Sequence, residues 1–237
     1  MRLGMLTPSS NTVLEPLTAA MLADLPGASA HFSRFRVVAI DLGAGSRGQF
    51  DPAPVVAAAE LLADARVDAI CWNGTSGAWL GLDVDRALSA AVTARTGIPA
   101  TTATLALMDA LGRLGARRYG LVTPYLGEVQ AAILERWAEA GLECAAERHL
   151  DDPGNFSFAE HGEDVVRRMV GEVAAACPDA VAVHCTNFRG GWAAAELERD
   201  LDVPVLDSVA VALWGAVRAA GGDPMPLARR WGRVFSL

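Results

Sequence analysis

Residues 2–8 read Arg-Leu-Gly-Met-Leu-Thr-Pro, and residues 118–124 repeat this pattern as Arg-Tyr-Gly-Leu-Val-Thr-Pro. A second pair follows in the same order, because Asp68-Ala69-Ile70 recurs as Asp179-Ala180-Val181. The two offsets are 116 and 111 positions. Matches in the same order and at similar offsets predict a chain built from a duplicated structural unit.

Short apolar runs around each repeat alternate with Ala/Leu-rich runs, which predicts parallel sheets covered by helices. The predicted strands are 3–6, 67–72, 120–123 and 180–184, and the predicted helices after them are 12–25, 79–95, 128–140 and 192–199. A third repeat, Ile98-Pro99 and Val203-Pro204 at an offset of 105, opens a further short strand in each half.

We therefore expect an α/β fold of two flavodoxin-like (Rossmann-like) lobes with parallel sheets, related by a pseudo-twofold axis. Residues 1–113 should form the first lobe and residues 114–207 the second, with residues 208–237 packing back on the first. Ligands of such sheets bind beyond the carboxyl ends of the strands, so the active site should lie in the cleft between the lobes. The offset of 111 then places Gly74 opposite Cys185 across that cleft.

Composition excludes several classes of function. The 237 residues carry a net charge of −8 without a basic cluster, which argues against a nucleic-acid partner. The N-terminus has no apolar signal region, and no stretch has the roughly 20 apolar residues that span a bilayer, so we expect a cytoplasmic protein without membrane contact. The four cysteines lack metal-ligand spacing, so neither a metal site nor a disulfide is predicted.

Cys185 is the first candidate for chemistry. It follows a predicted strand and precedes a segment, 186–191, in which we expect a helix to begin, and a helix N-terminus lowers a thiol pKa. The alternative is that Cys185 is a small buried hydrophobe. Gly74-Thr75-Ser76-Gly77 is the matching turn of the first lobe, and its glycines, hydroxyls and amides could hold an anion.

The turns after the first strand of each lobe offer further donors. Asn11 follows Pro8, Ser9 and Ser10 in the first lobe, and the Tyr125 hydroxyl belongs to the corresponding turn of the second. Ser10 or Asn11 could instead cap the helix that starts at Thr12. His184 precedes Cys185, but successive residues at a strand end point in opposite directions, so it is interpreted as structural.

Four segments carry a family resemblance: PSSNTVLEP (8–16), NGTSG (73–77), TPYLGEVQ (123–130) and HCTNFRG (184–190). They resemble motifs of the arylmalonate decarboxylase and maleate isomerase branch of the aspartate/glutamate racemase superfamily. This resemblance implies an enzyme that works in the interlobe cleft without cofactor or metal. Racemases and maleate isomerases of the superfamily have one cysteine in each lobe, whereas decarboxylases have glycine at the first position, as Gly74 and Cys185 do here.

The resemblance also implies site residues. It maps a dioxyanion hole, a set of donors for one carboxylate, onto Thr75, Ser76, Tyr125 and the backbone amide of Thr186. The segment containing Pro8, Ser10 and Asn11 is more similar to maleate isomerases, in which the asparagine helps to hold a carboxylate.

We therefore expect a decarboxylase, without cofactor, for a malonate-like or related small carboxylic acid, in which Cys185 protonates an enediolate. One alternative is a maleate isomerase-like cis-trans isomerase or an amino- or hydroxy-acid racemase. Another is a carboxylate-binding protein without catalysis. The expected partner is a small carboxylate or dicarboxylate, and a homo-oligomer is left open.

Overall fold

Two parallel sheets of four strands each form the framework of the protein. The computed structural model describes residues 1–37 and 52–237. The first sheet has the order β2-β1-β3-β4, with β1 Arg2–Pro8, β2 Ser29–Phe35, β3 Ala69–Trp72 and β4 Ala100–Thr102. The second has the equivalent order β6-β5-β7-β8, with β5 Arg118–Val122, β6 Glu143–Arg148, β7 Ala180–Val183 and β8 Val205–Asp207.

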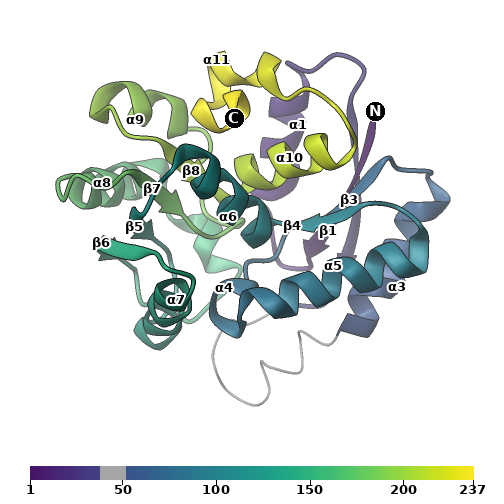
Figure 1. Cartoon of the computed structure of the whole chain (residues 1–237), viewed down its shortest axis with the longest axis horizontal. Helices are drawn as coiled ribbons and strands as arrows, with labels where there is room; N and C mark the ends of the chain where they lie inside the picture. Colours follow the sequence, from purple (N-terminus) through teal and green to yellow (C-terminus); the bar gives the residue numbers. More distant parts are fainter. Residues whose placement is uncertain (38–51) are drawn as a thin grey trace.

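Helices cover both sheets (Figure 1). Those of the first half are α1 Leu14–Leu22, α3 Pro52–Asp64, α4 Gly77–Leu80, α5 Leu82–Thr96 and α6 Ala103–Leu114. Those of the second half are α7 Gly127–Glu139, α8 Glu163–Ala174, α9 Ala194–Leu201, α10 Ser208–Ala219 and α11 Ala228–Trp231. None of the helices in residues 1–37 and 52–237 is long and apolar enough to cross a membrane.

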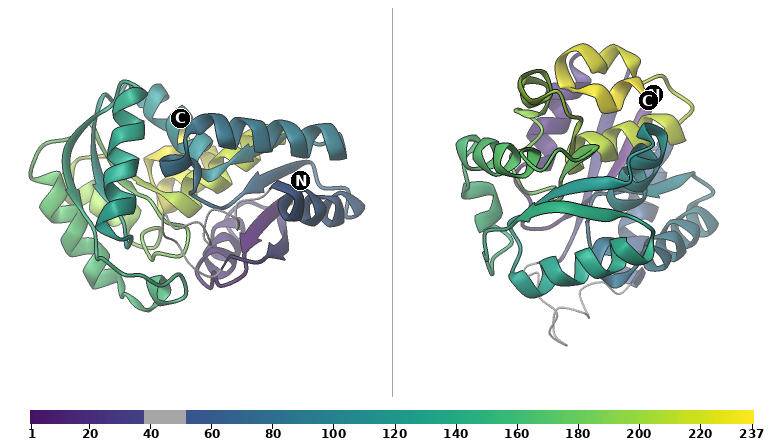
Figure 2. Two further views of the ribbon diagram at one scale, coloured as in Figure 1. Left: turned by 90° about the horizontal axis from the view of Figure 1, so that it is seen from below. Right: turned by 60° about the vertical axis from the view of Figure 1, so that its left-hand side comes forward.

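The strand register confirms the predicted duplication. In the first sheet Leu3 pairs with Ala69, and in the second Tyr119 pairs with Ala180. These partners are related by the same offsets, 116 and 111, that relate the sequence repeats. The predicted fold class of two related α/β lobes with parallel sheets is therefore correct, and the two lobes lie side by side in Figure 2.

Two predicted helices differ from the observed ones. The helix predicted over 79–95 is split into α4 and α5 at Gly81, whose φ of 110° is a backbone conformation that favours glycine. The helix expected directly after Cys185 is absent there, because α9 starts only at Ala194. A run of turns occupies the intervening residues, and this changes the electrostatic surroundings of the thiol.

The first helix of the C-terminal segment, α10, lies over the first lobe (Figure 1), whereas α11 and the last residues contact α9 and β8 of the second. Helix α10 packs against α6 and against strands β3 and β4 of the first sheet. Its inner side chains, among them Val211 and Trp214, are fully buried. This packing follows from composition, because α10 is apolar on nearly all sides and is stable only when covered.

Candidate active site

Side chains from both lobes enclose one narrow cavity at the carboxyl ends of the strands. Its volume of about 20 Å³ is enough for roughly one water molecule. The described residues that line it are Pro8, Asn11, Val37, Trp72, Gly74, Thr75, Ser76, Trp79, Tyr125, Asn155, Cys185, Thr186 and Asn187. None of these side chains carries a charge at neutral pH, so a bound carboxylate would be held by hydroxyl and amide donors.

Most of the residues selected from the sequence lie around this cavity. Eight of the nine candidates line it: Cys185, Gly74, Thr75, Ser76, Tyr125, Thr186, Asn11 and Pro8. The exception is Ser10, which is not among the lining residues and whose hydroxyl donates to the backbone oxygen of Val37 at 2.9 Å. Ser10 and Asn11 are neighbours in the turn, and only Asn11 faces the cavity. The sequence alone does not reveal which of the two faces inward.

Two crossed hydrogen bonds join the lobes at the cavity. The Tyr125 hydroxyl of the second lobe lies 2.6 Å from Thr75 Oγ1 of the first. In the opposite sense, Asn11 Nδ2 of the first lobe donates to Thr186 Oγ1 of the second at 3.1 Å. Thr75 and Thr186 are equivalent in the repeat, at the offset of 111, so each lobe presents the same threonine to the other lobe's first turn.

Asn187 is a lining residue that the sequence reasoning missed. Its Oδ1 accepts hydrogen bonds from the backbone amides of Thr12 at 2.9 Å and Val13 at 3.3 Å, and its Nδ2 donates to the oxygen of Asn155 at 2.6 Å. The Asn187 side chain, which belongs to the second lobe, thus caps the turn that precedes α1 in the first lobe. The only signal in the sequence was that Asn187 directly follows Thr186 and is the repeat equivalent of Ser76.

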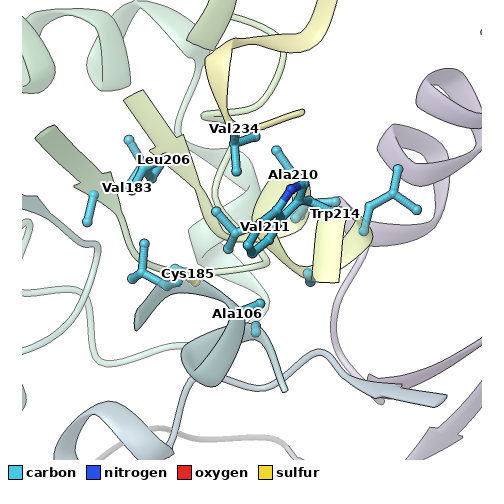
Figure 3. Close-up of a cluster of buried hydrophobic side chains, with 14 of the residues drawn as sticks. Ala106, Val183, Cys185, Leu206, Ala210, Val211, Trp214 and Val234 are labelled. Atoms are coloured by element: carbon cyan, nitrogen blue, oxygen red, sulfur yellow. The ribbon is translucent and has the colours of Figure 1, made fainter. Parts of the chain in front are cut away.

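The Cys185 thiol is buried and neutral. Figure 3 shows Cys185 at the edge of a buried apolar cluster that includes Val183 and Leu206. Burial raises the pKa of Cys185 to about 12, although the Tyr125 hydroxyl and the backbone amide of Asn187 oppose this shift. The expectation that a helix N-terminus lowers this pKa is wrong, because α9 starts nine residues further along. The thiol is therefore protonated at neutral pH.

Tyr125 is also a neutral donor. It is only 1% exposed, and burial raises its pKa well above the ordinary value for tyrosine. Edge-to-face contacts with Trp79 and Phe158, at ring centroid distances of 5.4 and 5.5 Å, hold its ring. Since its orientation is fixed before a ligand arrives, little reorganisation is needed when charge develops beside it.

Gly74 faces the cavity together with an aromatic ring that fills the neighbouring space. A Cβ atom at position 74 would overlap with the indole of Trp72, and φ at Gly74 is not positive. Packing, and not backbone conformation, is therefore what favours glycine here. Trp72 and Trp79 line the cavity, whereas Phe188 and Trp192 are not among the lining residues.

His184 is not among the residues that line the cavity, so it is not placed to act as a base. It is completely buried, and burial lowers its pKa to about 3, so the ring stays neutral. Its Nδ1 is 3.3 Å from the Ser208 hydroxyl. Residues 1–37 and 52–237 contain no group of three or more His, Cys, Asp or Glu side chains arranged to hold a metal ion.

Asp207, near Cys185, should make the free energy of unfolding of the protein depend on pH. Burial raises its pKa from 3.8 to about 7, so the native carboxyl stays protonated after the unfolded one has ionised. This contribution to stability is complete below about pH 4 and is lost as the pH rises to about 7. Asp207→Asn keeps an acceptor for the backbone amides of Val209 and Ala210 and removes the titration.

We therefore expect the free energy of unfolding of Asp207→Asn to rise relative to wild type between pH 4.5 and pH 7.5. Each pKa unit corresponds to about 1.4 kcal/mol, so the change should be on the order of a few kcal/mol. Urea unfolding at the two pH values measures it. A difference between variant and wild type that does not change with pH would contradict the buried, protonated state of Asp207.

Comparison with known proteins places these features in a family. The sequence profile described as arylmalonate decarboxylase matches residues 30–235. The arylmalonate decarboxylase of Bordetella bronchiseptica is 28% identical over 225 residues, which cover 93% of this chain and 90% of that protein. The maleate isomerase of Geobacillus stearothermophilus is 26% identical over 218 residues, which cover 87% and 86%.

The similar solved structures are of the same two kinds of enzyme. A crystal structure of arylmalonate decarboxylase has a TM-score of 0.78 at 26% identity and covers 100% of this chain and 99% of that one. The structure of a maleate isomerase from Pseudomonas putida S16 with maleate has a TM-score of 0.85 at 21% identity, with coverage of 100% and 97%. The second likeness is one of fold alone.

Proposed function

The chain belongs to the arylmalonate decarboxylase family, and from this membership we propose that it decarboxylates a malonate-like acid, with Cys185 as the proton donor. The family contains relatives named as decarboxylases and relatives named as maleate isomerases, so membership alone does not select between the two reactions. The choice rests on the chemistry that the cavity can perform.

The observation that carries the proposal is the single neutral thiol. Position 74, the repeat equivalent of Cys185, is glycine, and the space beside it is filled by the Trp72 indole. Two-base racemisation needs a proton donor and an acceptor on opposite faces of one carbon, and here only one face is served. A thiol with a pKa of about 12 is also a poor nucleophile, since the thiolate is the attacking species.

Decarboxylation matches this arrangement step by step. The bond between the α-carbon and one carboxylate breaks, CO₂ leaves, and the electron pair passes into the retained carboxylate, which becomes an enediolate. The Cys185 thiol then gives its proton to the α-carbon, and the resulting thiolate recovers a proton from water, releasing hydroxide. Because the thiol approaches from one side, a prochiral substrate would give one enantiomer.

Neutral donors suit the retained carboxylate in this reaction. The hydroxyls of Thr75, Ser76 and Tyr125 and the Thr186 amide are the proposed donors, and these residues line the cavity. Negative charge on the retained carboxylate grows as the enediolate forms, so fixed donors stabilise the transition state more than the bound substrate. The apolar side chains of Val37, Trp72 and Trp79 would favour loss of charge from the departing carboxylate.

Tyr125→Phe tests the role of these donors. Removing one donor of this kind lowers kcat by about 10²- to 10³-fold, and we expect that loss here with a smaller change in KM. The phenyl ring keeps the contacts with Trp79 and Phe158, so the fold should be retained. Steady-state kinetics with the malonate that is turned over fastest give kcat and KM. A rise in KM at unchanged kcat would mean that Tyr125 only binds the substrate.

A substrate panel tests the proposed reaction itself. Wild-type protein is incubated in D₂O with methylmalonate, phenylmalonate and maleate, and the products are followed by NMR. Release of CO₂ with one deuterium at the α-carbon supports the decarboxylase, and fumarate from maleate supports the isomerase. If no compound reacts but phenylacetate binds equally well to wild type and Cys185→Ala, the chain is a carboxylate-binding protein.

A further inference from the structure

An ion pair at the surface of the first lobe holds the turn that carries Asn11. Arg34 lies near the end of β2 and Glu15 in the first turn of α1, and Arg34 Nε and Nη2 are 2.9 and 2.8 Å from Glu15 Oε1. The Nη1 group of the same guanidinium donates to the backbone oxygens of Ser9 and Asn11, both at 3.0 Å. One side chain therefore fastens the turn at two points to β2 and α1.

This turn presents an amide N–H bond to the cavity. Asn11 is 1% exposed and lines the cavity. Its Oδ1 accepts hydrogen bonds from the backbone amides of Val13 and Leu14 at 3.0 and 2.9 Å, so Nδ2 is the atom that faces Thr186. One of the two hydrogens on Nδ2 is donated to Thr186 Oγ1, and no other acceptor among the described residues takes the second. A carboxylate in the cavity can accept this second hydrogen.

Arg34 itself does not reach the cavity. It is not among the described lining residues, and the Glu15 carboxylate neutralises its charge. A planar guanidinium bonds a carboxylate and two backbone oxygens at once in a fixed geometry, which the ammonium group of lysine does not reproduce. Arg34 therefore influences a bound carboxylate through the position of Asn11 and not through its own charge.

We propose that Arg34 is a positioning residue for the reaction, and that with Glu15 it holds Asn11 so that the second N–H bond of the Asn11 amide meets a carboxylate of the substrate. This gives a role to Glu15, the residue of the segment 8–16 that the site had left unexplained. The identity of the ligand rests on the proposed function, whereas the hold on Asn11 is the same for any acid that occupies the cavity.

The test measures whether Arg34 acts through Asn11. The Kd values of phenylmalonate and maleate are determined by calorimetry in a Cys185→Ser background, in which turnover is slow. Arg34→Gln removes the guanidinium, Arg34→Lys keeps the charge without the fork, and Asn11→Ser keeps a capping oxygen for α1 while removing the amide donor. The matched control is Arg86→Gln, which removes an exposed ion pair with Asp83 away from the cavity.

Arg34→Gln and Arg34→Lys should each weaken binding of the better-bound acid roughly fivefold or more, the size of coupling found within one hydrogen-bond network. Arg86→Gln should leave the Kd unchanged. In combination with Asn11→Ser, Arg34→Gln should have no further effect, because the N–H bond that it positions is already absent. The side chains of Arg34 and Glu15 are 40% and 34% exposed, so we expect the variants to fold. If Arg34→Gln does not fold, Glu15→Gln replaces it.

Three results would overturn the inference. An Arg34→Gln effect that is equally large with and without Asn11→Ser would show that Arg34 acts on the fold in general. Parental affinity in Arg34→Lys would show that the positive charge alone is enough, and parental affinity in Arg34→Gln would show that Asn11 needs no support. If wild type releases no CO₂ from phenylmalonate while Arg34 and Asn11 remain coupled in binding, the proposed reaction is wrong and the positioning role stands.

Discussion

Cys185→Ser is expected to keep the fold and to lose decarboxylation by roughly 10²- to 10⁴-fold, the usual contribution of a positioned proton donor. A hydroxyl is a weaker acid than a thiol, so it gives its proton to the enediolate carbon less readily. Serine differs from cysteine by one atom, and Cys185 is 3% exposed in a closely packed region, so we expect only a small change in the melting temperature.

The measurement is CO₂ release from phenylmalonate at saturating concentration, together with the affinity for phenylacetate by calorimetry. Phenylacetate binding should be nearly unchanged, which separates loss of chemistry from loss of binding. Cys177→Ser is the matched control, because Cys177 is an exposed free cysteine outside the cavity lining. Wild-type turnover in Cys185→Ser would exclude the thiol as the proton donor.

Gly74→Cys alone is not expected to create exchange of a substrate's α-proton with solvent. Combined with Trp72→Leu, it is expected to do so. The new Cβ would overlap with the Trp72 indole, and such overpacking typically costs about 1–3 kcal/mol. Removing the indole frees this space. The backbone is not an obstacle, since φ at Gly74 is not positive.

With thiols at positions 74 and 185, the double variant has a proton donor and an acceptor on opposite faces of the bound carbon. We expect it to exchange the α-proton of 2-phenylpropionate with D₂O roughly 10²-fold faster than Gly74→Cys or Trp72→Leu alone. NMR measures deuterium entry, thiol titration establishes that the introduced thiol is reduced, and a thermal melt establishes folding. A folded, fully reduced double variant without exchange would show that position 74 does not face the α-carbon.

The sequence by itself determined the duplicated fold and the turns that form the cavity. Both are consequences of local pattern: apolar runs define strands, and parallel strands bring their carboxyl ends to one edge. The repeat offsets of 116 and 111 reappear in the register of Leu3 with Ala69 and of Tyr119 with Ala180. That is why eight of the nine candidate residues lie around one cavity.

Only the tertiary structure decided the chemical state of the site. The pKa of Cys185 depends on burial and on α9 starting at Ala194, and neither follows from the residues next to the thiol. The contacts of Asn187 with Thr12 and Val13 join positions 175 and 174 apart in sequence, and the Trp72 ring beside Gly74 is a matter of side-chain packing. Local sequence encodes strand ends, whereas desolvation and packing depend on which distant side chains meet in the folded chain.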